Sequence, residues 1–145
     1  MLNVISGVGW TRRKRYGKIK QKVYFQWRAA KQLKITYANQ RIEKYFTDYA
    51  KMRKKIGLEL TRSVKKHVDH LRAADCFEDF LRLRLGRPEL LKGYKRPRYS
   101  IRVSANVRLI IELVDAEPDT IMICEAAEIE GVSDYHGGKD NWYLS

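Results

Sequence analysis

The sequence has few of the residues that mark secreted, metal-binding or membrane proteins. It holds two cysteines and three prolines in 145 residues. Cys76 and Cys124 lie far apart, without metal-ligand or redox spacing, which favours two reduced, buried thiols. No apolar run approaches the roughly 20 residues that span a bilayer. A basic cluster follows the first short apolar stretch, the reverse of a secretory signal. We therefore expect a cytoplasmic protein without a membrane segment.

Acidic residues are missing from the start of the chain. Residues 1–33 contain nine Lys or Arg and no Asp or Glu, whereas the remainder has 21 basic residues against 17 acidic ones. A net charge of +13 favours polyanionic partners, of which nucleic acid is the commonest in cytoplasm. We predict a basic extension over 1–32 and a folded domain over 33–145. The extension is either a flexible nucleic-acid tether or the product of an upstream start.

Hydrophobic periodicity within 33–145 predicts an α+β fold. An alternating strand is expected at 34–37, a helix from the N-cap Asn39 to about residue 55, and a second helix over 59–74. Their short connection predicts an antiparallel helical hairpin. The period then changes from 3.6 to 2, which predicts strands at 99–103, 107–113 and 120–127, with a short fourth at 132–135. We expect the hairpin to pack on one face of a three- to four-stranded antiparallel sheet.

Two histidines on the second predicted helix have a spacing that suits a metal. His67 and His70 lie three residues apart, but no third ligand with obvious geometry is near them. We interpret them as a pair on the helix surface and expect neither a metal nor another cofactor.

Cations and tyrosines alternate where the first strand after the helices begins. The segment contains five cations in eleven residues, together with Tyr94 and Tyr99; the cations are Lys92, Lys95, Arg96, Arg98 and Arg102. Basic side chains with aromatic rings that stack on bases suit single-stranded RNA. The alternative is a solvated edge that prevents sheet-to-sheet aggregation.

Residues with acid-base chemistry lie near the end of the chain. Asp134 and His136 are two apart on a predicted extended segment and so share a side, with Tyr135 on the other. Cleavage of RNA without a metal needs a base, an acid and cations around the phosphate. Arg108 interrupts an otherwise apolar strand, and a charge there needs a partner or an open cleft.

Two stretches, LKGYKRPRYSIRVSANVRLIIEL and EIEGVSDYH, resemble the HigB-type killer toxins of the RelE/ParE superfamily. The resemblance covers about Leu33 to Ser145 and includes IEKYF in the first helix. It implies a RelE-like fold and a ribosome-dependent mRNA endonuclease that acts in the ribosomal A site. It also implies a helix-turn-helix antitoxin of the HigA type as partner.

The resemblance assigns roles to individual residues. It implies that Lys92 and Arg108 stabilise the phosphate, that His136 donates or accepts a proton, and that Asp134 substitutes for or orients it. Tyr135 stacks on or positions a base. Contacts to mRNA or ribosomal RNA would come from Lys95, Arg96, Arg98 and Arg102.

One position departs from the family pattern, and two other functions stay open. Some members have a histidine three residues before the loop lysine, where this chain has Glu89, so the general acid and the general base are not assigned. One alternative is a ParE-like toxin that poisons DNA gyrase without nuclease activity. The other is a degenerate homologue that only binds RNA.

Overall fold

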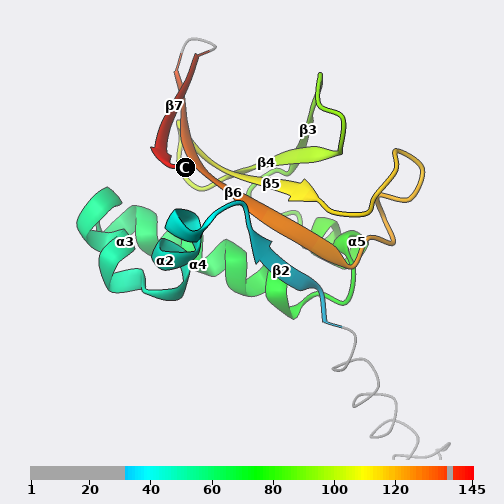
Figure 1. Cartoon of the computed structure of the whole chain (residues 1–145), viewed down its shortest axis with the longest axis horizontal. Helices are drawn as coiled ribbons and strands as arrows, with labels where there is room; N and C mark the ends of the chain where they lie inside the picture. Colours follow the sequence, from blue (N-terminus) through cyan, green and yellow to red (C-terminus); the bar gives the residue numbers. More distant parts are fainter. Residues whose placement is uncertain (1–31, 137–138) are drawn as a thin grey trace, which may run out of the picture. The chain divides into compact units, whose positions relative to one another are not determined.

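The computed structural model describes residues 32–136 and 139–145, apart from the side chains of residues 135, 136 and 139–141. The basic extension predicted over 1–32 lies outside the described residues except for Gln32. Residues 33–145 form one unit of four helices and a six-stranded sheet (Figure 1). The predicted α+β class is confirmed. Within the described ranges, no helix has the length and apolar character to cross a membrane.

The helices come first along the chain and most of the strands follow. The order is β2 (Lys34–Tyr37), α2 (Gln40–Thr47), α3 (Tyr49–Ile56), α4 (Leu58–Ala73), α5 (Phe77–Arg82), β3 (Glu89–Leu91), β4 (Arg98–Arg102), β5 (Val107–Leu113), β6 (Ala126–His136) and β7 (Lys139–Leu144).

The sheet is mixed rather than antiparallel, which corrects the sequence prediction. Its strand order is β2-β6-β5-β4-β3, and β7 pairs with β6 outside this path. β2 runs parallel to β6, whereas the other pairs are antiparallel. β6 pairs with β5 along one edge and with two strands along the other. On that second edge, Ala126 to Ile129 pair with β2, and Val132 to His136 pair with β7 (Figure 1).

The first predicted helix is two helices. The Asn39 side chain accepts a hydrogen bond from the Ile42 amide at 2.9 Å and begins α2, as expected. Asp48 then adopts a non-helical conformation and accepts from the Ala50 amide at 3.1 Å, so it begins a new helix, α3. Gly57, with φ of 92°, ends α3 and begins α4, because a positive φ is accessible to glycine at little cost.

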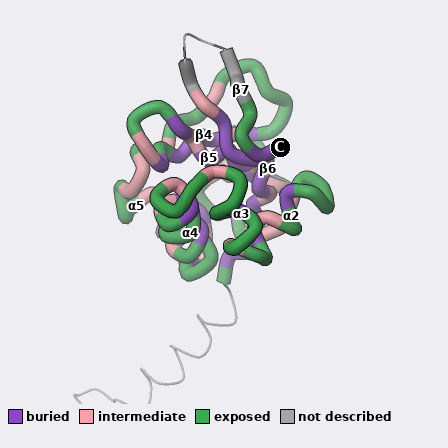
Figure 2. Tube along the Cα trace, turned by 90° about the vertical axis from the view of Figure 1, so that its left-hand side faces the viewer, coloured by how far each residue is buried: buried purple, intermediate pink, exposed green. Residues whose placement is uncertain are grey.

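The helices cover one face of the sheet. Ile42, Met52 and Val64 from the helices are completely buried, as are Leu109 and Ile129 from the central strands. These residues belong to one hydrophobic cluster, and buried positions follow the central strands and the inner sides of the helices (Figure 2). The opposite face of β4, β5 and β6 is therefore free to carry polar side chains.

Several strand boundaries differ from those predicted. Residues 120–125, expected to begin a strand, form a turn over 120–123 and an irregular link over 124–125, and β6 begins only at Ala126. β6 also includes the expected short strand at 132–135. β3, β7 and α5 were not predicted as regular elements. Tyr99, expected to be available for base stacking, lies in the core against Phe77, with ring centroids 4.7 Å apart.

Candidate functional site

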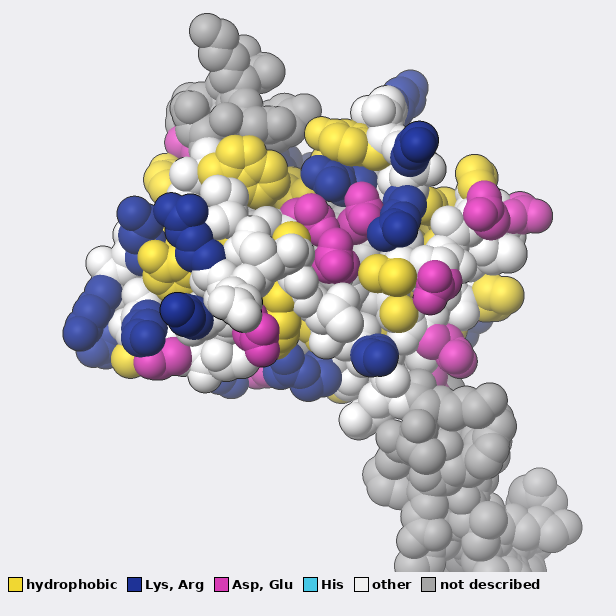
Figure 3. Space-filling model, viewed as in Figure 1, with side chains coloured by type: hydrophobic (Ala, Val, Ile, Leu, Met, Phe, Trp, Pro, Cys, Tyr) yellow, Lys and Arg dark blue, Asp and Glu magenta, His cyan; other side chains and the backbone are white. Residues whose placement is uncertain are grey.

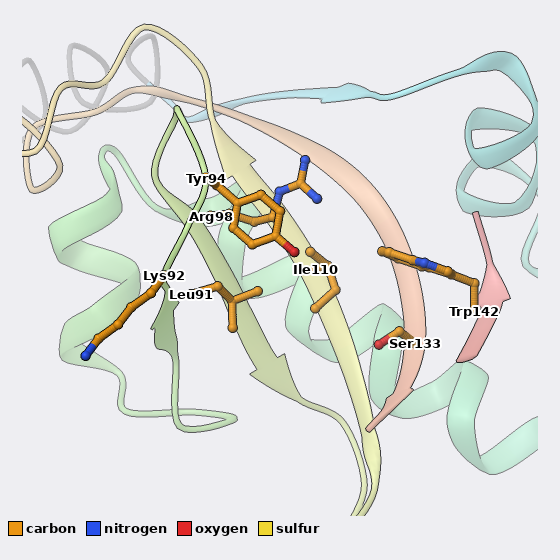
Figure 4. Close-up of a pocket in the computed structure, with 7 residues that line it drawn as sticks. All are labelled: Leu91, Lys92, Tyr94, Arg98, Ile110, Ser133 and Trp142. Carbon is orange, nitrogen blue, oxygen red and sulfur yellow. The ribbon is translucent and has the colours of Figure 1, made fainter. Parts of the chain in front are cut away.

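A cavity lies on the face of the sheet that the helices leave uncovered. Its volume is about 300 Å³, and it is lined by Leu91, Lys92, Tyr94, Arg98, Ile110, Ser133 and Trp142 (Figure 4). These residues come from the β3–β4 region, β5, β6 and β7. The cavity thus joins the Lys-Gly loop to the strand that carries Ser133, although about 40 residues separate them in the sequence. We call it the Lys92 cavity.

Two aromatic side chains stand on opposite sides of the Lys92 cavity. Figure 4 shows Tyr94 on one side and Trp142 on the other, with Ile110 between them. The Tyr94 ring stacks on the Arg98 guanidinium, 4.3 Å from centroid to Cζ. Both rings are substantially exposed, at 45% for Tyr94 and 40% for Trp142. An exposed ring beside a cation is the arrangement on which nucleic-acid bases stack.

The Ser133 hydroxyl is a polar group at the floor of the cavity. Ser133 is 1% exposed, and its Oγ has no hydrogen-bond partner among the described residues. A buried hydroxyl without a partner carries a desolvation cost. A ligand in the cavity that hydrogen-bonds to this oxygen would remove that cost.

Arg98 is held by carboxylates. Its Nη2 lies 3.2 Å from Glu112 and 3.3 Å from Glu130, and all three side chains are less than 20% exposed. Arg96 also contacts Glu112, at 3.4 Å. Burial, followed by a hydrogen bond with Glu128, raises the pKa of Glu130 to about 7, although Arg98 opposes the rise. Arg96 and Arg98, which were predicted to contact RNA, therefore already form ion pairs with carboxylates of this chain.

Three of these carboxylates converge. Glu112, Glu128 and Glu130 each offer an oxygen, and these atoms lie within 4.8 Å of one another. Among the described residues this is the group whose geometry suits a metal ion. Arg98 already occupies the space beside two of them, so the cluster has a cation of its own.

The histidine pair differs from its prediction. His67 is buried rather than on the helix surface, with Nδ1 2.7 Å from the Ser63 carbonyl oxygen. Burial lowers its pKa. His70 makes the equivalent contact to the Lys66 carbonyl at 2.7 Å and is partly exposed.

The Arg108 guanidinium donates hydrogen bonds to backbone carbonyls of its own turn. Its Nη1 donates to the carbonyl oxygens of Ser104, Ala105 and Val107 at 3.2 to 3.3 Å. The guanidinium therefore folds over the turn before β5, and Arg108 is not among the described residues that line the Lys92 cavity. Its backbone pairs with Ser133, so the two residues share the open face of the sheet.

The terminal acid of the predicted set has a partner of its own. Asp134 pairs with the buried Val107 on β5, and its Oδ2 accepts a hydrogen bond from the Tyr143 hydroxyl at 3.1 Å. Since successive residues of a strand alternate, Asp134 lies on the side opposite Ser133. The backbones of Tyr135 and His136 pair with Asp140 and Lys139. The side chains of Tyr135 and His136 lie outside what the structure describes.

The remaining predicted contacts lie around the cavity mouth and along β4. Lys95 is exposed in the loop before β4, and Arg102 is exposed at the end of that strand, opposite Arg108. Glu89, which stands where some HigB-type toxins have histidine, is exposed on β3 and pairs with Ser100.

Sequence reasoning missed part of the cavity. Neither Trp142 nor Ser133 is among the site residues predicted from the sequence, yet both line the cavity. The alternation of Glu128 and Glu130 with apolar residues predicts a strand with one polar face, but it would place Ser133 on the other face. The register shift opposite Ile110 and Ile111 brings Ser133 to the polar face. Comparison of this chain with protein-family models, with curated proteins and with solved structures finds no match.

Proposed function

We propose that this chain is the toxin of a type II toxin-antitoxin system and inhibits translation by cleaving mRNA on the ribosome. The observation that carries the proposal is the Lys92 cavity. Lys92, from the Lys-Gly loop, and Ser133, from the strand that ends in Asp-Tyr-His, line the same space. These two segments are the ones that the resemblance to HigB-type toxins couples, and they are distant in the sequence.

The proposed reaction uses side chains of the chain itself. The attacking 2′-OH loses its proton, the 5′ oxygen leaves with a proton, and cations stabilise the phosphate between them. Lys92 is exposed at the cavity rim, and its amine points away from the other lining side chains (Figure 4). It supplies one positive charge when its side chain turns toward the cavity, and Arg108 supplies another when it turns from the carbonyls of its own turn. We assign the proton transfer to His136, with Asp134 as its alternative or orienting partner. Asp134 lies on the side of β6 opposite Ser133, so the RNA has to pass from the Lys92 cavity around the end of β6 to reach this pair.

The cavity supplies binding as well as charge. Tyr94 and Trp142 offer two rings for stacking, Tyr135 positions a base, and Lys95, Arg96, Arg98 and Arg102 contact the backbone of mRNA or ribosomal RNA. Stacking on an aromatic ring contributes about 1–3 kcal/mol per base. The hydrogen bond from Tyr143 restricts the Asp134 carboxylate.

A second candidate function is RNA binding without cleavage. It is favoured by the position of Arg108, whose guanidinium donates to three backbone carbonyls instead of lining the Lys92 cavity. A protein of this kind binds RNA through the same rings and cations but leaves it intact.

We place the proposed activity in the cytoplasm, where translating ribosomes occur, and we propose a HigA-like helix-turn-helix antitoxin as the inhibitor. An inhibitor with acidic side chains complements a chain of net charge +13.

The test is an in vitro translation reaction with purified ribosomes, followed by mapping of mRNA 5′ ends. The full chain is compared with its Lys92→Gln and His136→Ala variants, with RNA lacking ribosomes as a further arm. New 5′ ends that need ribosomes and are lost in both variants support the nuclease. RNA that stays intact while translation stops supports binding alone. Double-strand breaks in plasmid DNA incubated with gyrase, with intact mRNA, support the ParE-like alternative.

A further inference from the structure

A second concave surface lies on the helices, away from the Lys92 cavity. It has a volume of about 350 Å³ and is lined by Arg41, Lys44, Tyr45, Lys51, Lys54 and Lys55. Figure 3 shows Lys and Arg side chains gathered over the region of α2 and α3, with hydrophobic atoms between them. We call this surface the α2–α3 hollow. None of its residues lines the Lys92 cavity.

The break between the two helices builds the hollow. Positions 41, 44 and 45 of α2 and positions 51, 54 and 55 of α3 have the same i, i+3, i+4 spacing, which places each set on one helix face. The buried residues Ile42, Phe46 and Met52 lie outside these two basic faces. Because Asp48 ends α2 and begins α3, the two basic faces line one hollow instead of following one straight helix.

The cations of the hollow differ from Arg96 and Arg98 in their partners. Arg96 and Arg98 are paired with Glu112 and Glu130. Over the described part of the chain, no salt bridge uses a cation of the hollow; the bridges join other residues. No acidic residue is among the described residues that line the hollow. An anion can therefore bind here without breaking an internal ion pair.

The kind of anion follows from the arrangement. Each helix presents cations one turn apart, about 5–6 Å between Cβ atoms, and two such rows face one hollow. Several cations at regular spacing suit a chain of phosphates better than a single carboxylate or a small metabolite. Tyr45 adds a half-buried ring among them, which suits contact with a sugar or base.

We propose that the α2–α3 hollow binds the phosphate backbone of structured RNA, separately from the Lys92 cavity. The proposal rests on the proposed function in one respect, because a nuclease that acts on the ribosome meets structured ribosomal RNA. The hollow then anchors the protein, and the cavity receives the single strand. Anchoring and cleavage depend on different residues.

The test measures the salt dependence of RNA binding by the full chain. A labelled RNA hairpin without a reading frame is titrated from 50 to 300 mM KCl. The variant carries Lys44→Gln, Lys51→Gln and Lys55→Gln. The matched control carries Lys34→Gln, Arg62→Gln and Lys66→Gln, which are exposed cations outside the hollow. The slope of log K against log salt is negative, and each lost phosphate contact lowers its magnitude by about 0.7–0.9. We therefore expect the magnitude to decrease by about 2 for the variant and by less than about 1 for the control.

A charge-conserving variant separates binding from folding. Lys44→Arg, Lys51→Arg and Lys55→Arg together keep the cations and should retain the wild-type slope. Equal slopes for the hollow variant and the control would overturn the proposal. An acidic protein would then be the next candidate ligand for the hollow. Failure of the proposed function is a distinct result: the wild-type chain would leave translated mRNA uncut, whatever the slopes are.

Discussion

Glu130 gives the sharpest prediction about stability. It lies among three carboxylates, where the Arg98 guanidinium serves both Glu112 and Glu130. Burial and the neighbouring acids raise its pKa from 4.5 to about 7. The Glu130→Gln change replaces the carboxylate with a neutral side chain of the same shape. We expect this variant to be more stable than the wild type at pH 8, because it removes the cost of holding another negative charge there.

The sign and size follow from proton linkage. The folded state holds the Glu130 proton more tightly than the unfolded chain does, so it binds more protons between pH 4.5 and 7. The free energy of unfolding therefore falls as pH rises through this interval. A pKa rise of this size corresponds at most to about 3 kcal/mol. The side chain is partly exposed, and solvent screening reduces the expected effect to about 1–2 kcal/mol.

Urea unfolding at pH 5, 6, 7 and 8 measures the effect. We expect the stability of Glu130→Gln to be closest to that of the wild type at pH 5 and to exceed it by a margin that grows to about 1–2 kcal/mol at pH 8. Glu117→Gln, at an exposed turn, is the control and should follow the wild type throughout. A Glu130→Gln variant that is less stable than the wild type at pH 8 would refute the reasoning, because the ion pair with Arg98 would then outweigh the cost of burial.

Three further substitutions test the packing around the two surfaces by chemical unfolding. Gly131→Ala should cost about 2–4 kcal/mol, because Gly131 has a φ of 150° and an added Cβ would collide with the Leu144 carbonyl oxygen; an unchanged midpoint would show that β7 moves freely. Asn39→Ala should cost about 1 kcal/mol through loss of the cap on the Ile42 amide, and an Asn39→Asp variant should retain most of it. Tyr49→Phe should be neutral or stabilising by up to about 1 kcal/mol, because the buried Tyr49 hydroxyl has no partner among the described residues; a loss above about 1 kcal/mol would indicate a missed hydrogen bond.

Local signals in the sequence were sufficient for the helices and for part of the sheet. The cap at Asn39, the break at Gly57 and the alternation around Ile101 each follow from one short segment, and each appears in the structure. Asp48 was also a local signal, since aspartate is a favoured N-cap, but the apolar period continues through it and hides the break.

The parallel pairing and the exact strand ends depend on distant residues. β2 and β6 are joined by hydrogen bonds between residues about 90 positions apart, and no short pattern encodes that contact. The apolar run before Ala126 has the composition of a strand, yet residues 120–123 form a turn and 124–125 are irregular. There the Cys124 carbonyl accepts from the Phe77 amide at the start of α5, so tertiary contacts decide the conformation.

Two of the residues chosen from the sequence, Lys92 and Arg98, line the cavity, but their surroundings could not be predicted. The carboxylate partners of Arg98 come from β5 and β6, and only the sheet register brings them together. Tyr99 was taken for a stacking residue, but strand alternation turns it into the core.

The central claim is that the chain cuts mRNA on the ribosome, and mapping of mRNA 5′ ends in bacteria tests it most directly. The full chain is induced beside His136→Ala, and 5′ ends are sequenced across the transcriptome shortly afterwards. The account predicts new ends in register with the reading frame of translated messages, absent in the variant. Growth arrest by the wild-type chain with no new ends in translated messages would contradict it.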